Sequence, residues 1–269
     1  MPKLPTEDAS RYRHLEKMST AELLSSINLE DNTVASTVQH SLNQIEKLVD
    51  ALVPKIKNGG RLFYLGAGSS GRLGVLDASE CPPTYGVDET MVTAVIAGGD
   101  QALRKAIENA EDDDVQGFID LKKENISNKD FLVGIAASGK TPYVLGALQK
   151  SKAAGITTGC IVCNPDSPIA ATADYPVEII VGPEIVSGST RMKAGTAQKM
   201  ALNMISTALM IRLGRVKDNK MVDMKISNSK LKNRGIQMIC EEKGVSPEKA
   251  EELLSMYGTV RKVLSDFVI

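Results

Sequence analysis

Apolar residues follow two different patterns along the chain. In the first part they recur at helical spacing, which predicts a helix that begins near Ser19 and a long helix over residues 31–53. From residue 61 on, short apolar runs alternate with helical segments, and each run predicts a strand. The predicted strands cover residues 61–65, 90–97, 130–137, 157–162 and 175–181. The predicted helices of this part cover residues 70–79, 101–110, 113–124, 141–154 and 191–213.

Apolar strands that alternate with helices indicate an α/β fold, in which a parallel sheet has helices packed on both faces. Pro82 and Pro83 are expected to end the first helix of this domain. We expect three parts: an N-terminal arm with helices over residues 1–54, the sheet domain over residues 55–215, and a short helical appendage over residues 216–269. Ligands of such sheets bind beyond the carboxyl ends of the strands, so the loops there are expected to form the binding site.

Composition and charge narrow the classes of function. The net charge is −1 and the chain has no Trp, so neither a nucleic acid nor an anionic membrane is an expected partner. No apolar run is long enough to cross a bilayer, and the first residues lack the apolar stretch of a secretory signal, so we expect a cytoplasmic protein. Two histidines, His14 and His40, are too few for a His-rich metal site, which leaves acid–base chemistry to carboxylates.

Cys160 and Cys163 have the spacing of a redox pair. They lie in an apolar, β-branched run that predicts a buried strand, whereas a redox pair normally opens a helix. In a reducing cytoplasm the cysteines of this chain would remain thiols. We therefore expect structural residues at both positions.

The strongest local motif is the loop over residues 66–72, which follows a predicted strand and opens a helix. Its glycines allow the backbone to approach an anion, the helix start offers free N–H groups, and Ser69 and Ser70 add hydroxyl donors. The loop also fits the dinucleotide pattern G-x-G-x-x-G, but the acidic residue that this pattern requires comes late, at Asp100. Alone, the loop is compatible with a nucleotide, a sugar phosphate or a tight turn without a ligand.

A second loop of the same kind favours a sugar phosphate. Ser138, Gly139 and Thr141 follow the third predicted strand and precede a helix, without the glycine spacing of a Walker loop. Two hydroxyl-rich loops on two strands suit one compact phosphomonoester better than a long dinucleotide, although two capped helices without a ligand share the pattern. A third hydroxyl-rich segment, residues 187–196, is either a ligand contact or a capped helix start with solvated basic side chains.

Taken together, these segments resemble one family. Similarity to the signature of N-acetylmuramic acid 6-phosphate etherases is found in residues 66–87, with the unusual stretch around Glu80, and in residues 96–99, 134–144 and 189–199. The resemblance extends from about residue 19 to about residue 235. It implies the sugar isomerase (SIS) fold, a three-layer αβα sandwich with a central parallel sheet, plus N-terminal helices and a small C-terminal helical appendage.

The resemblance implies a lyase that cleaves the lactyl ether of N-acetylmuramate 6-phosphate, giving N-acetylglucosamine 6-phosphate and D-lactate in amino-sugar recycling. Glu80 resembles the proton donor to the leaving oxygen, and Glu111 resembles its acid/base partner. Without the resemblance, Glu80 is a plain helix-end residue and Glu111 belongs to a solvated acidic run. The residues expected to bind the substrate and its phosphate are Gly68, Ser69, Ser70, Ser138, Gly139, Thr141, Ser189, Arg191 and Lys193. Neither a cofactor nor a metal is expected.

The distance along the helix between the two halves of the expected site predicts a homodimer. Ser70 and Glu80 are separated by about 15 Å of helix at 1.5 Å per residue, which is longer than a hexose phosphate. We therefore expect that Glu80 serves the active site of a partner chain.

Two other functions use the same loops. An aldose–ketose sugar-phosphate isomerase would need one carboxylate base. A sugar-phosphate sensor, similar to the regulatory protein of animal glucokinase, would need the loops but no catalytic carboxylate.

The C-terminal tail looks shorter than is usual in the family, which puts its contribution to substrate closure or oligomer contacts in doubt.

Overall fold

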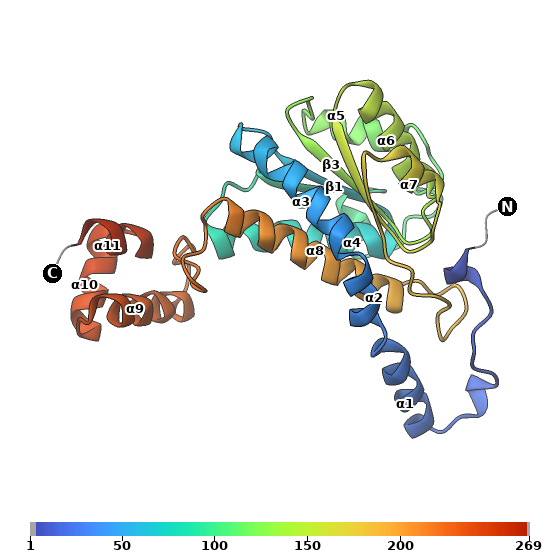
Figure 1. Ribbon diagram of the computed structural model, residues 1–269, viewed down its shortest axis with the longest axis horizontal. Helices are drawn as coiled ribbons and strands as arrows, with labels where there is room; N and C mark the ends of the chain where they lie inside the picture. Colours follow the sequence, from blue (N-terminus) through green and yellow to red (C-terminus); the bar gives the residue numbers. More distant parts are fainter. Residues whose placement is uncertain (1–3, 268–269) are drawn as a thin grey trace.

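The computed structural model describes residues 4–267, and a parallel sheet forms its centre (Figure 1). Within these residues the sheet has 5 strands in the order β2-β1-β3-β4-β5, and every neighbouring pair is parallel. The strands are β1 (Leu62–Gly66), β2 (Val92–Ile96), β3 (Phe131–Ala136), β4 (Thr157–Val162) and β5 (Tyr175–Glu178). Each of the predicted strands is confirmed, with small shifts at the ends.

Helices cover both faces of the sheet (Figure 1). One face carries α3 (Leu42–Lys57), α4 (Gly68–Tyr85) and α8 (Lys193–Arg212), and the other carries α5 (Gln116–Lys123), α6 (Pro142–Ala153) and α7 (Pro168–Thr172). Successive strand residues enter opposite cores: Tyr64 and Val133 contribute to the first, Phe63 and Leu132 to the second. The expected three-layer αβα arrangement is confirmed.

The N-terminal part is an arm of short helices. It contains η1 (Pro5–Glu7), η2 (Leu15–Lys17), α1 (Thr20–Asp31) and α2 (Val34–His40). Ser19 caps α1 in a capping box with Glu22, as its sequence predicts. The predicted helix over residues 31–53 is broken at Ser41, whose hydroxyl donates to the carbonyl of Glu178 on β5 at 2.7 Å. This bond to the sheet competes with regular helix, so the prediction of one long helix is wrong.

Two further helix predictions are wrong. In place of the helix over residues 101–110, a short 3-10 turn, η3 (Asp100–Leu103), leads into an irregular loop. Asn109 in this loop has φ of 60°, a left-handed conformation that interrupts a helix. α4 continues through Pro82 and Pro83, because the fixed φ of proline suits a helix and only bonds of the last turn are lost before Gly86 ends it.

The C-terminal helices form a small bundle of their own, drawn in red in Figure 1. They are α9 (Ser229–Lys243), α10 (Pro247–Tyr257) and α11 (Val260–Asp266), and they share a hydrophobic cluster that includes Ile239, Leu253 and Val263. Lys225 N donates to Pro83 O at 3.1 Å, which joins the segment before α9 to the end of α4. The division of the chain at residues 54 and 215 stays a prediction.

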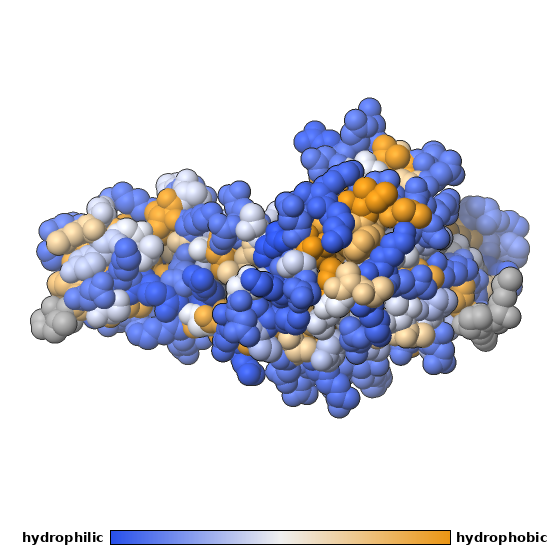
Figure 2. All heavy atoms as spheres, turned by 90° about the horizontal axis from the view of Figure 1, so that it is seen from above, coloured by the Kyte–Doolittle hydropathy of each residue, from blue (hydrophilic) through white to orange (hydrophobic). Residues whose placement is uncertain are grey.

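The surface mixes polar regions with a few apolar ones. Figure 2 shows one largely hydrophilic face with an apolar patch on the main body. Exposed large apolar side chains include Leu24 and Leu29 on α1 and Ile211 on α8. Among residues 4–267, no helix has the length and hydrophobicity needed to cross a membrane.

Candidate active site

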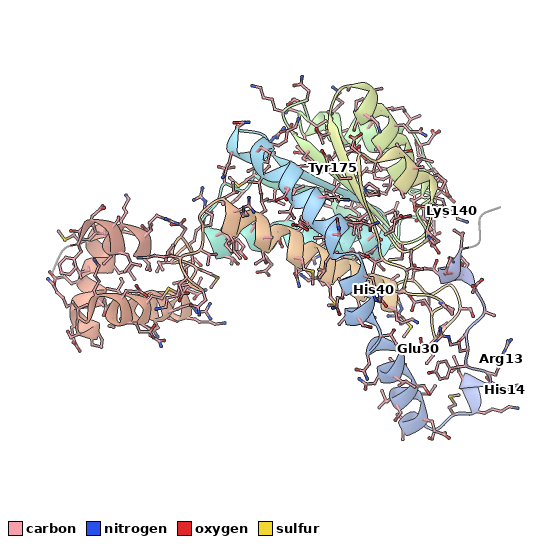
Figure 3. The ribbon with its side chains drawn as sticks, viewed as in Figure 1. Arg13, His14, Glu30, His40, Lys140 and Tyr175 are labelled. Atoms are coloured by element: carbon pink, nitrogen blue, oxygen red, sulfur yellow. The ribbon has the colours of Figure 1, made fainter. Side chains whose placement is uncertain are left out.

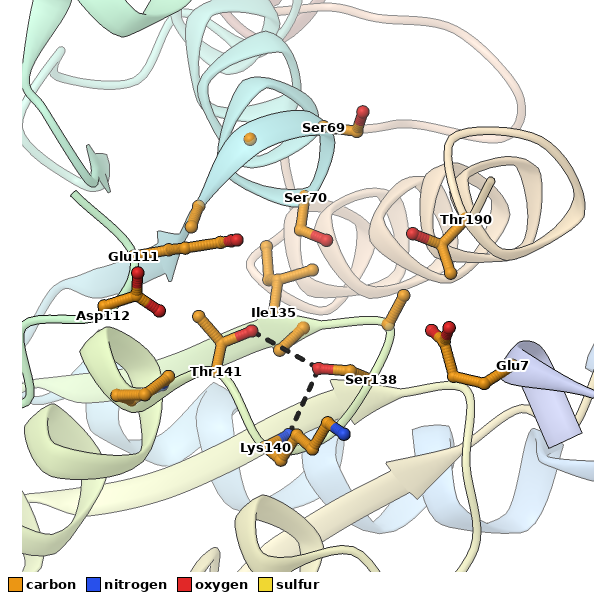
Figure 4. A pocket seen from close by; sticks show the side chains of 15 residues that line it. Glu7, Ser69, Ser70, Glu111, Asp112, Ile135, Ser138, Lys140, Thr141 and Thr190 are labelled. Carbon is orange, nitrogen blue, oxygen red and sulfur yellow. Dashed lines mark hydrogen bonds between the residues drawn. The ribbon is translucent and has the colours of Figure 1, made fainter. Parts of the chain in front are cut away.

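A polar cavity of about 490 Å³ opens beyond the carboxyl ends of β1 and β3 (Figure 4). The starts of α4 and α6, the N-terminal arm, the loop after η3 and the segment before α8 form its wall. Its lining consists of Glu7, Ala67, Gly68, Ser69, Ser70, Glu111, Asp112, Ile135, Ala136, Ala137, Ser138, Lys140, Thr141, Pro142 and Thr190. This is the edge of the sheet at which a parallel α/β fold binds its ligands.

The first predicted loop places a helix N-terminus at the cavity. The N–H groups of Gly68, Ser69 and Ser70 come before the first helical bond of α4, which Gly71 N donates at 3.1 Å. These amides and the positive end of the helix dipole favour an anion. The strand and the helix can approach this closely because Gly71 has no side chain: a Cβ there would lie 2.8 Å from Gly66 O.

The second loop adds hydroxyl groups beside the start of α6. Ser138 Oγ and Thr141 Oγ1 lie 3.4 Å apart, and Lys140 N donates to Ser138 Oγ at 3.3 Å (dashed lines in Figure 4). Gly139 has φ of +69°, and a Cβ there would lie 2.3 Å from Ser167 Oγ, so this turn requires glycine. The structure thus brings the two predicted phosphate loops to one cavity.

The irregular loop after η3 carries Glu111 and Asp112 to the same cavity. The carbonyl of Glu111 accepts a hydrogen bond from Tyr143 N at 3.0 Å, which attaches the loop to the first turn of α6. Gly146 allows the loop to lie on α6, since a Cβ there would be 1.8 Å from Asp114 O. In Figure 4 the Glu111 side chain extends toward Ser70. A carboxylate therefore faces the loops that offer hydrogen-bond donors.

In the third predicted segment, Thr190 lines the cavity, whereas Ser189 and Arg191 lie beside it outside the lining. Lys193 is 2% exposed, and its ammonium group pairs with the Glu30 carboxylate on α1 at 2.5 Å. In this structure Lys193 joins the N-terminal arm to α8.

Glu7 reaches the cavity from the N-terminal arm and was not predicted. Thr6 beside it is fully buried: its N–H donates to Asn164 Oδ1 at 3.1 Å, and Asn164 Nδ2 donates to Thr6 Oγ1 at 2.8 Å. These bonds hold Glu7 on the wall opposite Glu111 (Figure 4). The contact spans most of the sheet domain in sequence, so no local pattern could have identified Glu7.

Glu80 lies outside this cavity, on the exposed side of α4. The helix between Ser70 and Glu80 is continuous, so the two are separated by about 15 Å along its axis. A single chain therefore brings Glu111, but not Glu80, to the phosphate loops.

A buried carboxylate lies one turn before Glu80. Asp77 accepts hydrogen bonds from Tyr64 Oη at 3.0 Å and from Ser206 Oγ at 3.1 Å, which connects α4 to β1 and α8. Burial raises the pKa of Asp77, the two hydrogen bonds oppose that shift, and the charge of Glu80 adds to it. The helix segment that carries Glu80 is therefore fixed from its buried side.

The histidines and cysteines contribute no further site. His14 and His40 lie on different parts of the arm (Figure 3), and among residues 4–267 no group of three or more His, Cys, Asp or Glu side chains is arranged to hold a metal ion. Cys160 and Cys163 are fully buried and belong to cores on opposite faces of the sheet. Burial raises the pKa of the Cys160 thiol to about 12. The predicted buried strand is confirmed, and the structural role of the two cysteines stays a prediction.

The fold and the cavity together define a SIS-domain protein. The SIS domain profile matches residues 107–208, and the profile of the glucokinase regulatory protein N-terminal SIS domain matches residues 44–152. Solved structures share the fold: a phosphoheptose isomerase from Neisseria gonorrhoeae has a TM-score of 0.55 and 17% identity over 71% of this chain and 98% of its own. A putative phosphosugar isomerase from Bacteroides fragilis has a TM-score of 0.54 and 21% identity over 73% of this chain and 94% of its own.

Sequence relatives give a narrower assignment. An N-acetylmuramic acid 6-phosphate etherase from Christiangramia forsetii is 61% identical over 96% of this chain and 94% of its own length. One from Bacteroides fragilis is 57% identical over 97% and 93%, and an etherase 1 from Bacillus licheniformis is 50% identical over 91% and 81%. The chain belongs to the N-acetylmuramic acid 6-phosphate etherase family. The match covers 94% of the length of the Christiangramia forsetii relative and 81% of that of the Bacillus licheniformis relative. The expectation of a shortened tail stays a prediction.

Proposed function

We propose that this protein cleaves the lactyl ether of N-acetylmuramate 6-phosphate to N-acetylglucosamine 6-phosphate and D-lactate. The observation that carries the proposal is the 61% identity with a named etherase over 96% of the chain. The cavity supports it, because it combines two donor-rich loops with a carboxylate at the same strand ends.

The phosphate of the substrate binds between the starts of α4 and α6. The free N–H groups of Gly68, Ser69 and Ser70 and the hydroxyls of Ser138 and Thr141 are the donors that an anion with acceptor oxygens requires. Placing the phosphate there directs the sugar toward the carboxylates on the cavity wall. Ser189, Arg191 and Lys193 were expected to bind substrate as well. Of this segment, Thr190 lines the cavity, and Lys193 is paired with Glu30.

Glu111 acts on the reacting carbons. In the open-chain aldehyde the C2 hydrogen is acidified by C1, so a carboxylate base can remove it. Elimination then breaks the C3–O bond and releases lactate with a proton, and water adds to the unsaturated aldehyde. Glu80 donates the proton to the leaving oxygen. One carboxylate thus accepts a proton while the other donates one, as general acid–base catalysis requires. The elimination and the hydration change no oxidation state overall, so the reaction requires no redox cofactor.

Glu80 reaches the site as part of a homodimer in which each chain completes the cavity of the other. The separation of about 15 Å along α4 supports this arrangement, and exposed apolar side chains such as Leu24, Leu29 and Ile211 offer surface for a protein contact. We place the enzyme in the cytoplasm, where its cysteines, all free, remain reduced.

Incubation of the purified protein with N-acetylmuramate 6-phosphate, followed by a D-lactate assay, tests the proposal. The wild type should release lactate, and Glu80→Gln and Glu111→Gln should each lower kcat by about 10²-fold or more. Glu108→Gln is the matched control, because Glu108 is exposed in the same loop as Glu111. Retained binding of the sugar phosphate without lactate release would instead favour an isomerase or a sensor.

A further inference from the structure

Gln198 on α8 is buried, and half of its carboxamide has no hydrogen-bond partner. Its side chain is 1% exposed. Gln198 Oε1 accepts a hydrogen bond from Ser70 Oγ at 2.9 Å, whereas Nε2 has no acceptor among residues 4–267. Leaving a buried donor unpaired costs on the order of 1–3 kcal/mol, and such groups are rare in folded proteins. An unpaired donor next to a cavity residue therefore calls for a physical explanation.

Ser70, the partner of Gln198, lies on the wall of the cavity between Glu111 and Thr190 (Figure 4). A serine hydroxyl has one proton to donate, and here that proton points to Gln198. The oxygen lone pairs of Ser70 are then the groups left for a ligand. A phosphate dianion has only acceptor oxygens and repels lone pairs, so the Ser70 hydroxyl cannot donate to phosphate in this arrangement, although the Ser70 N–H can.

A half-turn of the carboxamide would free the Ser70 proton and give the unpaired Nε2 an acceptor. Rotation about the last torsion of Gln198 exchanges Oε1 and Nε2 with almost no change in shape. Nε2 then donates to Ser70 Oγ, and the hydroxyl proton is free to point into the cavity. The group left without a partner becomes the carbonyl oxygen, which proteins leave unpaired more often than an N–H.

We propose that Gln198 is a positioning residue for the substrate phosphate: its carboxamide turns over when phosphate binds, so that Nε2 donates to Ser70 Oγ and Ser70 donates to the phosphate. This inference rests on the proposed function, because it assumes that the cavity binds a phosphate. Gln198 itself does not touch the ligand. It acts through Ser70, and the two bonds in series polarise and strengthen each other.

The dissociation constant of inorganic phosphate tests the proposal by calorimetry on the full chain. In Gln198→Glu the side chain is a carboxylate that only accepts, so it retains the Ser70 proton. We expect phosphate binding about tenfold weaker or more. Gln198→Leu releases the Ser70 proton and should bind phosphate within a few-fold of the wild type. Gln39→Glu, at an exposed position on α2, adds the same charge away from the site and should have no effect.

The double variant with Ser70→Ala separates this role from plain charge repulsion. In the Ser70→Ala background, Gln198→Glu should cost much less than in the wild type, because no serine proton remains to be held. Equal losses in both backgrounds would overturn the proposal, since through-space repulsion does not depend on Ser70.

A spectroscopic readout remains decisive where a variant fails to fold. The side-chain amide NMR signal of Gln198 should shift when phosphate is added to the wild type and stay constant in Ser70→Ala. A constant signal in the phosphate-saturated wild type would refute the turnover. If the wild type binds phosphate without releasing lactate, the proposed reaction fails while the role of Gln198 is still tested. If it binds no phosphate, the role of Gln198 fails, and lactate release alone decides the proposed reaction.

Discussion

The cavity that we assign to the substrate phosphate is lined by carboxylates, which repel an anion. The individual residues of the lining explain how both can be accommodated. Glu7, Glu111 and Asp112 line it together with one cation, Lys140, among the described residues. A phosphate therefore cannot be held by charge alone and must bind at the amides and hydroxyls of the two loops. The carboxylates are left for groups that donate hydrogen bonds or release protons, such as sugar hydroxyls, an acetamido N–H or an acidified C–H.

Glu7 should contribute to binding of the sugar more than of the phosphate. In Glu7→Gln the neutral side chain accepts a hydrogen bond from the sugar less strongly than a carboxylate does. KM for N-acetylmuramate 6-phosphate should therefore rise by about tenfold with kcat nearly unchanged. Inorganic phosphate should inhibit the variant as well as or better than the wild type, because a negative charge is removed. Glu16→Gln, on the exposed part of the same arm, is the control. A fall in phosphate affinity would contradict this assignment.

Asp77 should make stability depend on pH in a defined direction. Burial raises the pKa of this carboxyl above its ordinary value of 3.8, so the folded protein holds the proton more tightly than the unfolded chain does. The stabilising contribution is complete below pH 3.8 and is lost as the pH rises through the raised value. Asp77→Asn cannot titrate. The wild-type free energy of unfolding, measured relative to this variant in urea, should therefore fall from about pH 4 upward. A difference that does not change with pH would exclude titration of Asp77 in this range.

At the scale of elements, the loop that carries Glu111 depends on its contact with α6. Gly146→Ala would place a methyl group 1.8 Å from Asp114 O, so the loop must move. We expect a loss of roughly 1–3 kcal/mol in the free energy of unfolding and a larger relative loss of kcat than of phosphate affinity. Urea unfolding and lactate release measure the two effects.

Ser151→Ala is the matched control on the same helix. It removes a buried hydroxyl that has no partner among residues 4–267, so stability and kcat should be preserved. A Gly146→Ala variant with wild-type kcat would show that the loop position does not matter for the reaction.

The elements that the sequence predicts well are those with a local cause. Buried strands show as apolar runs, and the loops after β1 and β3 show as glycine and serine motifs. The five strands and the position of both loops at one cavity were therefore predicted correctly. Local sequence patterns give wrong or incomplete predictions where a contact between residues distant in sequence determines the structure. The bond from Ser41 to Glu178 breaks a helix, and the bonds from Thr6 to Asn164 bring Glu7 to the site. The role of Gln198 could not be predicted from the sequence, because it rests on a side-chain Nε2 that has no hydrogen-bond acceptor among the described residues of the folded chain.

At the scale of the whole molecule, a mixing experiment tests the shared site. Chains with Glu80→Ala and chains with Glu111→Ala should each be inactive. After subunit exchange, the mixed dimer contains one complete site, so about a quarter of the wild-type lactate release should return at equal mixing. Each single variant mixed with itself is the control. Failure of the mixture to regain activity would indicate that Glu80 and Glu111 serve the same chain, whereas an active Glu80→Ala variant would show that Glu80 has no role.

The length of α4 also has a kinetic consequence. If the two ends of this rigid helix serve two different cavities, a dissociated chain has phosphate loops but no proton donor, and dissociation disables both sites at once. Specific activity would then be constant at high enzyme concentration and fall on dilution, in parallel with the dimer population. An assay run at nanomolar enzyme would then give a low specific activity. The cause would be incomplete dimerisation and not slow chemistry at the active site.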